Sequence, residues 1–329
     1  MRGFSACSKD DSGNQQQEPE YPSPTPVPSA DYKGLAFISS GESTVRLAQV
    51  GTPYEISLEY STDESHWKPY TIGETITLAD STFLLFRSGE HKNRKFSKDD
   101  ENYYHFEISG PISAQGNIMS LLNRDFSTPL STNAFFALFE GCTSLLSAPE
   151  LPATTMEQGC YFRMFAECTG LKSAPELPAK ELAYNCYGWM FKGCSALTYV
   201  PDLPATEMVS YCYNNMFANC TSLKFAPELP ATRLDMGCYH CMFEGCTSLT
   251  SAPELPATEL VSNCYEFMYK DCRNLRYVIG LFTTEPSEKT TKDWLSGVAA
   301  SGTFIKSKKA TWDVTSAHGV PEGWKIETW

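Results

Sequence analysis

The sequence predicts an α+β multidomain protein, in which an N-terminal β-sandwich precedes a solenoid of 26-residue repeats with terminal caps. Each repeat is expected to hold one short strand and one helix. Cysteine and leucine recur every 26 residues between residues 142 and 281, and many of the residues between them recur with the same period. A period of about 20 to 50 residues is typical of solenoids, whose units bury apolar surface only by stacking. Before residue 113, short apolar runs instead alternate with turn residues, which is a strand pattern.

Eleven of the 13 cysteines fall into two columns of this repeat. The first column is Cys142, Cys168, Cys194, Cys220, Cys246 and Cys272, and the second is Cys160, Cys186, Cys212, Cys238 and Cys264. A leucine follows the first column by three residues in every unit. Because stacked repeats present one extended surface, we expect the functional site to lie on that surface.

Composition divides the 329 residues into five segments. We expect a lipoprotein-type N-terminus with a proline-rich tether (1–31), a β-sandwich domain (32–112), an N-terminal cap of the solenoid (113–141), the leucine-rich solenoid (142–281) and a C-terminal cap (282–329).

The first residues resemble the end of a bacterial lipoprotein signal, with small residues just before Cys7. This resemblance implies lipid attachment at Cys7 and a cell-surface location as an outer-membrane lipoprotein. The acidic stretch 8–11 is similar to the export signal of Bacteroidetes surface lipoproteins. No apolar stretch precedes Cys7, so the sequence is expected to begin inside the signal peptide or after its trimming. Residues 12–30 are rich in Gln, Glu, Pro and Ser, a composition that favours an extended tether.

The segment 32–112 has the alternation of half-buried strands. Apolar residues recur at every second position in 54–60 and 104–108, between turns rich in Gly, Asp and Ser. About seven strands in 80 residues suit a β-sandwich. Trp67 and Tyr70 lie in a turn-rich stretch, where they are either core residues or a platform on which a glycan stacks.

Within a unit, Cys160, Met164, Phe165 and Cys168 are spaced as one face of a helix. The extended segment that follows is expected to be a strand of only three or four residues. Pro175 and Pro178 each lack a ladder donor and interrupt it.

The cysteine columns are expected to pack as free thiols. Two residues eight apart on a helix are about 12 Å apart, and stacked helices lie about 8–10 Å apart, beyond the roughly 7 Å that a disulfide spans. Cys241 lies outside both columns, so it is expected nearer to solvent and reactive. One Cys-x-x-Cys, Cys238 to Cys241, supplies too few ligands for zinc.

After residue 281 the repeat fails. We expect a short helix at 294–298 and strands at 303–306 and 324–328. Trp294, Trp312 and Trp324 are expected to cover the open core of the last repeat.

The motif F-x-x-C-x-x-L-x-x-[AV] resembles the BspA-like leucine-rich repeats of bacterial surface proteins. It covers about residues 134–281 and matches, for example, at Phe165, Cys168, Leu171 and Ala174. The resemblance, together with the tether, implies a Bacteroides-type surface lipoprotein that binds host macromolecules. One departure is that each repeat has an acidic residue where the family has an apolar one, and its leucine arrives one residue later.

These acidic residues form the most distinctive surface column, which is Glu150, Glu176, Asp202, Glu228 and Glu254. At a strand spacing of about 4.8 Å, neighbouring charges repel by roughly 0.9 kcal/mol in water, which an exposed column tolerates. The column is a solvated surface, a site for a basic partner, or, with added ligands, a metal site. Beside it lie Tyr199, Phe225 and Tyr277. These residues either form an exposed hydrophobic patch that binds a partner or pack against neighbouring loops.

Composition and motifs exclude several classes of function. A net charge of −13 argues against nucleic acid as a partner, and no apolar run is long enough to span a membrane. No motif predicts a catalytic residue, a cofactor or a metal site, so an enzyme is not expected.

Three functional hypotheses remain. The first is a non-enzymatic adhesion protein that presents its repeats to a host or matrix protein. The second is a surface glycan-binding lipoprotein that holds polysaccharide on the β-sandwich and uses the repeats as a spacer. The third is a purely structural role in the cell envelope.

Overall fold

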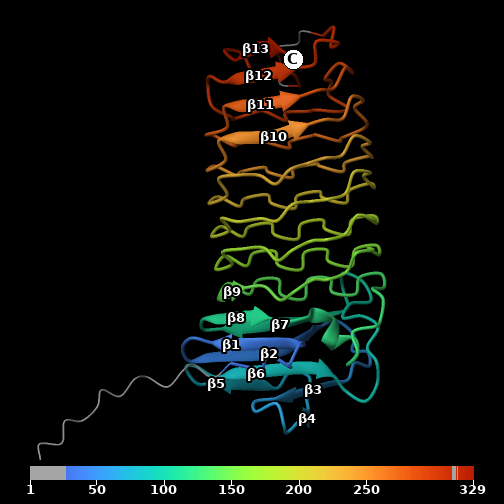
Figure 1. Cartoon of the computed structure of the whole chain (residues 1–329), viewed down its shortest axis with the longest axis vertical. Coiled ribbons are helices and arrows are strands. Elements are labelled where there is room, and N and C mark those ends of the chain that lie inside the picture. Colours follow the sequence, from blue (N-terminus) through green and yellow to red (C-terminus); the bar gives the residue numbers. More distant parts are fainter. Residues whose placement is uncertain (1–26, 313–315, 317) are drawn as a thin grey trace, which may run out of the picture.

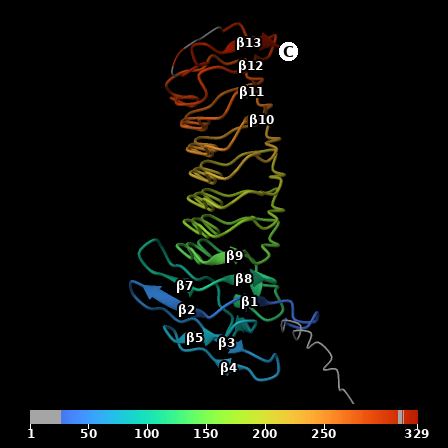
Figure 2. The same ribbon diagram turned by 90° about the vertical axis from the view of Figure 1, so that its left-hand side faces the viewer.

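The computed structural model describes residues 27–312, 316 and 318–329. The protein is an elongated column, with β-sheets at its N-terminal end, stacked 26-residue units along its length and parallel strands at its C-terminal end (Figure 1). Strand-bearing segments lie along one side of the stack and turn segments along the other (Figure 2). Cys7 and most of the predicted tether lie outside the described residues.

The N-terminal part contains two sheets that pack face to face. One is the six-stranded sheet β4-β3-β6-β1-β8-β9, and the other is the three-stranded sheet β5-β2-β7. Phe37 and Phe106 join them, with ring centroids 5.1 Å apart. The strands of this part are β1 (Leu35–Ser39), β2 (Ser43–Val50), β3 (Leu58–Ser61), β4 (Lys68–Pro69), β5 (Thr75–Leu78), β6 (Phe83–Ser88), β7 (Tyr103–Ser109) and β8 (Ile112–Gln115). Neighbours pair antiparallel, except that β8 pairs in parallel with β9 (Leu145–Ser147).

The N-terminal sheets and the stacked units share one hydrophobic core. Phe106 of β7 stacks on Phe139 of the first unit, with ring centroids 5.2 Å apart. The Cys142 thiol donates a hydrogen bond to the Phe106 carbonyl at 3.0 Å. One cluster of buried apolar side chains extends from Leu35 to Trp324. The architecture therefore changes near residue 113 without a linker, inside a continuous core.

The predicted helix of each unit is wrong, and with it the α+β fold class. The only helical element among the described residues is the four-residue 3-10 helix η1 (Ile118–Leu121). The segments expected to be helical, such as 159–168, are instead successions of tight turns. The protein is nearly all β-strand, turn and irregular chain, with mixed and parallel sheets, and its units are not strand–helix repeats.

Backbone hydrogen bonds in each turn segment alternate between two directions. The amides of Phe162 and Met164 bond the carbonyls three residues earlier, at 3.0 and 3.2 Å. The amides of Tyr161, Arg163 and Phe165 instead bond carbonyls of the next unit, 25 residues later, at 2.9 to 3.1 Å. Since every second amide leaves its own unit, these bonds hold neighbouring units together as a ladder does in a sheet.

A left-handed residue at every fourth position produces this alternation. In the second unit, Gly159, Arg163 and Glu167 have φ of 59°, 57° and 60°. The same three positions recur in the other units as Asn133, Ala137 and Gly141; Asn185, Trp189 and Gly193; Tyr211, Asn215 and Asn219; Gly237, Cys241 and Gly245; and Asn263, Phe267 and Asp271. A residue with positive φ ends a right-handed helix, so none can propagate through these segments.

The spacing of the apolar residues is compatible with two backbone conformations, an α-helix and a series of turns that repeats every four residues. Cys160, Met164 and Cys168 lie four residues apart, and Tyr161 and Phe165 repeat the same step. A helix brings such residues to one side only approximately, with 3.6 residues per turn. A turn that repeats every four residues brings them to one side without drift, and all five side chains are buried. The predicted inward face is confirmed, although the backbone behind it is different.

Prolines keep most units from forming regular strands. β10 (Ser251–Leu255) and β11 (Tyr277–Gly280) pair in parallel, with an irregularity between Ser251 and Glu254. Between residues 171 and 230, in the described chain, the only pairing on this side is a bridge between Ser173 and Tyr199. Each unit there carries two prolines, and a proline cannot donate to a ladder. β10 also contains Pro253, but its partner β11 contains no proline.

Stacked aromatic rings fill the core of the units. One column is Phe139, Phe165, Phe191, Phe217, Phe243 and Tyr269, with neighbouring ring centroids 5.4 to 5.7 Å apart. The other is Phe135, Tyr161, Tyr187, Tyr213, Tyr239 and Tyr265, at 5.7 to 6.0 Å. These distances lie within the range in which aromatic pairs attract. They also give the approximate spacing of the units.

The cysteines are free, as predicted, and the first column has a specific bonding role. The thiol of Cys220 donates to the Phe191 carbonyl of the preceding unit at 3.2 Å. Cys168, Cys194, Cys246 and Cys272 make the equivalent bond at 3.0 to 3.1 Å. All 12 cysteines in the described residues are reduced and buried. Each of these five thiols donates to a carbonyl that also accepts a backbone amide of its own unit, as Phe191 does from Cys194 at 3.1 Å, so the thiols add a second bond that joins neighbouring units.

The C-terminal segment continues the parallel sheet and closes the core. β12 (Thr303–Lys306) pairs with β11, and β13 (Lys325–Thr328) pairs with β12. These two strands are confirmed, whereas the helix expected at 294–298 is a turn with Gly297 at φ 74°. The three predicted covering residues Trp294, Trp312 and Trp324 are all buried.

The left-handed positions give a direct test at Asn219, which is exposed and has φ of 62°. We expect Asn219→Val to lower the free energy of unfolding by about 1–2 kcal/mol, because a branched side chain disfavours this backbone. Urea unfolding followed by far-ultraviolet circular dichroism measures the change.

The matched control is Asn219→Gly, which removes the same amide but accepts positive φ, and we expect it to stay within about 0.5 kcal/mol of the wild type. Equal stability of the valine and glycine variants would show that the left-handed backbone is not required.

Candidate functional site

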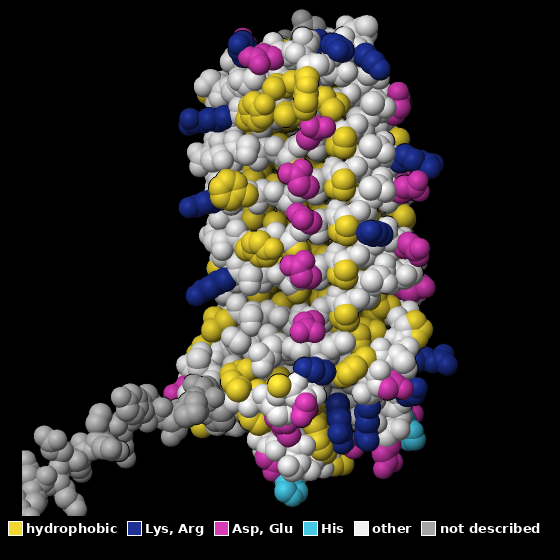
Figure 3. Space-filling model, viewed as in Figure 1, with side chains coloured by type: hydrophobic (Ala, Val, Ile, Leu, Met, Phe, Trp, Pro, Cys, Tyr) yellow, Lys and Arg dark blue, Asp and Glu magenta, His cyan; other side chains and the backbone are white. Residues whose placement is uncertain are grey.

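The strand-bearing side of the units presents a zoned surface, which we call the strand face. It is formed by the segments 146–152, 172–178, 198–204, 224–230 and 250–256. In Figure 3, acidic side chains run as a column along the middle of this face, with hydrophobic side chains on both sides and Lys or Arg toward both edges. Exposed Lys172, Lys224 and Arg276 recur at one position of the repeat, just before the aromatic positions.

The acidic column is exposed along most of its length. Glu150, Glu176, Asp202 and Glu228 are exposed, and Glu254 is half-buried. In the described part of the chain, none of these carboxylates has a hydrogen-bond or ion-pair partner. They can therefore pair with a cationic group of another molecule without breaking any hydrogen bond or ion pair within the protein.

The position of the leucine, one residue later in each repeat and directly after the acidic residue, explains why the acidic side chains face outward. Ala174 and Leu177 point into the core, whereas Glu176 between them is exposed. A leucine at the position of Glu176 would have faced solvent. The displaced leucine noted in the sequence therefore preserves the buried face and leaves the acid outside.

The aromatic residues beside the acidic column are exposed and do not pack under loops. Tyr199 and Phe225, in adjacent units, keep 57% and 71% of their surface accessible, and Tyr277 keeps 40%. Serine occupies the same position in three other units, as Ser147, Ser173 and Ser251. The fold therefore does not need an aromatic side chain at this position.

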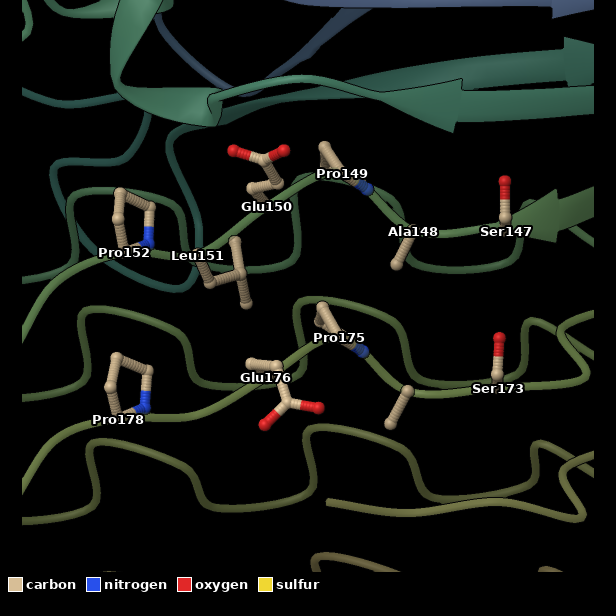
Figure 4. Close-up of a pocket in the computed structure, with 11 residues that line it drawn as sticks. Ser147, Ala148, Pro149, Glu150, Leu151, Pro152, Ser173, Pro175, Glu176 and Pro178 are labelled. Carbon is tan, nitrogen blue, oxygen red and sulfur yellow. The ribbon is translucent and has the colours of Figure 1, made fainter. Parts of the chain in front are cut away.

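A groove of about 570 Å³ opens at the N-terminal end of the strand face. Its walls are the segments 147–152 and 173–178, which run side by side with their prolines and acids at matching positions (Figure 4). The prolines and the acids are evident from the sequence, whereas the groove is not. Its signal was the loss of amide donors at Pro149, Pro152, Pro175 and Pro178, which leaves the two segments unpaired.

Trp67 and Tyr70 do not form an exposed platform. Tyr70 lies in the N-terminal core with only 7% of its surface accessible, and its hydroxyl accepts a hydrogen bond from the Leu47 amide at 2.8 Å. Trp67 is half-buried, and the Arg87 guanidinium lies 3.7 Å from its ring centroid. Of the two interpretations of these aromatics, the structure places Tyr70 in the core and covers one face of Trp67.

The prediction of a solvent-accessible Cys241 is wrong. Only 6% of this residue is accessible, and burial, with the nearby Glu244 carboxylate, raises the pKa of its thiol. His240 Nε2 lies 3.7 Å from the thiol sulfur and 3.6 Å from Glu266. A raised pKa disfavours the thiolate, so this cluster lacks an activated nucleophile. No cluster of three or more residues suited to a metal ion occurs among the described residues.

No family model, curated protein or solved structure matches this chain. Among the residues that the structure describes, none belongs to a helix with the length and apolar character needed to cross a membrane.

The buried thiols predict a loss of stability at high pH. Burial raises the pKa of Cys246 to about 12 and that of Cys264 to about 11. In the unfolded chain a thiol ionises near pH 8.5, so the unfolded state releases protons first. Stability is full below about pH 8.5 and falls as the pH rises toward the folded-state values. We expect the midpoint of urea unfolding to decrease between about pH 8 and pH 10, and Cys246→Ala to reduce that slope.

Iodoacetamide labelling provides a second measurement of the same property. The native protein should stay unlabelled at the described cysteines near pH 8 and react fully once unfolded in urea. A flat midpoint up to pH 10, or rapid labelling of the native protein, would contradict the burial of these thiols.

Proposed function

We propose that this protein is a non-enzymatic binding protein that uses its strand face to adhere to a host or matrix macromolecule. The observation that carries the proposal is the exposure of Tyr199 and Phe225 on adjacent units of that face. Aromatic side chains are frequent among the residues that contribute most to binding energy. The serines at the same position elsewhere argue that these two rings serve a partner and not the fold.

The charges around the aromatic pair support recognition of a macromolecule. Asp202 and Glu228 follow the two aromatics by three residues, and the lysine Lys224 directly precedes Phe225. Charged groups around an apolar centre orient a partner and exclude wrong ones, while the apolar centre supplies most of the affinity. A protein partner fits this arrangement. Polysaccharide is the alternative partner, and the experiment described below includes both.

The proposed setting is the bacterial cell surface. Support comes from the sequence, because the residues before Cys7 resemble a lipoprotein signal and the repeat resembles BspA-like surface proteins. In this proposal, lipid on Cys7 anchors the chain to the outer membrane, and the proline-rich tether holds the strand face away from it.

The test uses the full chain against a panel of matrix proteins and polysaccharides, with surface plasmon resonance as the measurement. We expect at least one panel member to bind, and Tyr199→Ser with Phe225→Ser to weaken that binding at least about tenfold. The free energy of unfolding should change by less than about 0.5 kcal/mol, since serine is native at this position in other units.

The matched control replaces Tyr184 and Met236 by serine. These two exposed residues share one repeat position before the turn segments, away from the strand face, and serine is native there at Ser210 and Ser262. Unchanged binding in this control with loss in the first variant supports the proposal. Equal loss in both variants, or no binding to any panel member, contradicts it.

A further inference from the structure

The groove at the first two units has features of a docking site. Ser147 and Pro149 on one wall face Ser173 and Pro175 on the other, and the cavity measures about 570 Å³. This volume lies within the range of about 300–1,000 Å³ in which proteins bind ligands. The walls combine proline and alanine surface with hydroxyl and carboxylate groups, so the groove suits a ligand that has both apolar and polar parts.

The two walls are held from outside and not by each other. The Glu150 amide donates to the Gly116 carbonyl at 2.8 Å, toward the N-terminal sheets. The Ala174 amide donates to the Tyr199 carbonyl at 3.1 Å, toward the third unit. Among the described residues, no backbone hydrogen bond joins 147–152 to 173–178. The groove is therefore an opening between two segments that are each supported by other parts of the chain.

The charge of the groove selects its occupant. Glu150 and Glu176 line opposite walls, both are exposed, and neither has a hydrogen-bond or ion-pair partner in the part of the chain that the structure describes. In Figure 4 their carboxylates turn away from each other and from the space between the two segments, so each is placed to meet a separate cation at its own edge of the groove. Neither Lys nor Arg lines the groove. A ligand with two positive groups and apolar stems between them would complement this surface.

The spacing of the units fits an extended peptide. Stacked rings place neighbouring units 5.4 to 6.0 Å apart. Alternate residues of an extended strand lie on one face and are about 6.6 Å apart. The two carboxylates turn away from each other and do not share the spacing of the rings, but lysine and arginine can reach them because their stems are long and flexible, and those stems bury well against apolar surface such as the proline rings.

We propose that the groove, with Glu150 and Glu176, docks an extended segment of a partner protein that carries lysine or arginine at alternate residues. The segment crosses the groove along the stack, with one cation at each wall and the stems over Pro149 and Pro175. From there it continues toward Asp202 and the aromatic pair. This inference rests on the proposed function, since it names the chemistry of the partner that the strand face binds.

The probe is a short fluorescein-labelled peptide in which lysine alternates with serine, and the readout is fluorescence anisotropy at near-physiological salt. A second peptide has the same composition with its lysines in one block. We expect the full chain to bind the alternating peptide more tightly than the block peptide. Glu150→Gln with Glu176→Gln should weaken the alternating peptide about tenfold and abolish the preference.

The control is Glu157→Gln with Glu181→Gln, which removes two exposed carboxylates outside the groove and changes the net charge equally. We expect less than about twofold loss in this variant, because at physiological salt distant surface charges are screened beyond about 8 Å. Equal loss in both double variants, or equal binding of the two peptides, would mean that the acidic chain attracts cations without a site, and would overturn the inference.

The two proposals fail separately. If the lysine peptide does not bind while a panel member still requires Tyr199 and Phe225, only the groove inference is wrong. If the peptide binds as expected while the aromatic variant keeps full panel binding, the groove is a site and the aromatic surface is not the adhesive one.

Discussion

The structure depends on a left-handed backbone residue at every fourth position of the turn segments. This conformation lets consecutive amides bond alternately within a turn and to the next unit, as Phe162 and Tyr161 do. Without it, the chain would bond only to itself, as a helix does, and neighbouring units would be held by side chains alone. With it, the units are cross-linked on the turn side, even where prolines prevent a ladder on the strand face. The opening between the first two units is possible because the turn side provides this cohesion.

The left-handed positions carry a cost that the core offsets. Glycine, asparagine and aspartate occupy many of them, but the middle position of the segment holds Arg163, Trp189 and Phe267. Such residues disfavour positive φ by roughly 1–2 kcal/mol. Behind them, two aromatic columns and the thiol-to-carbonyl bonds run through the whole stack and into the N-terminal sheets. Because this core is continuous, the sheets and the units are expected to unfold together.

The sequence was sufficient for the repeat period, the buried columns, the free cysteines and the outward acids, because each of these follows from side-chain chemistry at a fixed spacing. It was insufficient for the backbone. A four-residue step in apolar residues resembles a helical step, and the distinguishing mark was the recurrence of Gly or Asn eight residues apart, as at Asn185 and Gly193. Cys241 was misjudged for the same reason, since it occupies a left-handed position and not the outer face of a helix. The groove depends on which amides remain unpaired between two units, and no single repeat displays that.

The serine, tyrosine and phenylalanine that share one position on the strand face have a consequence for how such a protein changes over time. The core positions are nearly invariant between units, whereas Ser173, Tyr199 and Phe225 differ where nothing buried depends on them. Selection for a new ligand can therefore change these exposed residues without requiring a compensating substitution in the core. Duplication or loss of a whole unit would lengthen or shorten the face by one step and leave every remaining contact of the same kind. The architecture separates the part of the sequence that maintains the fold from the part that is free to diversify.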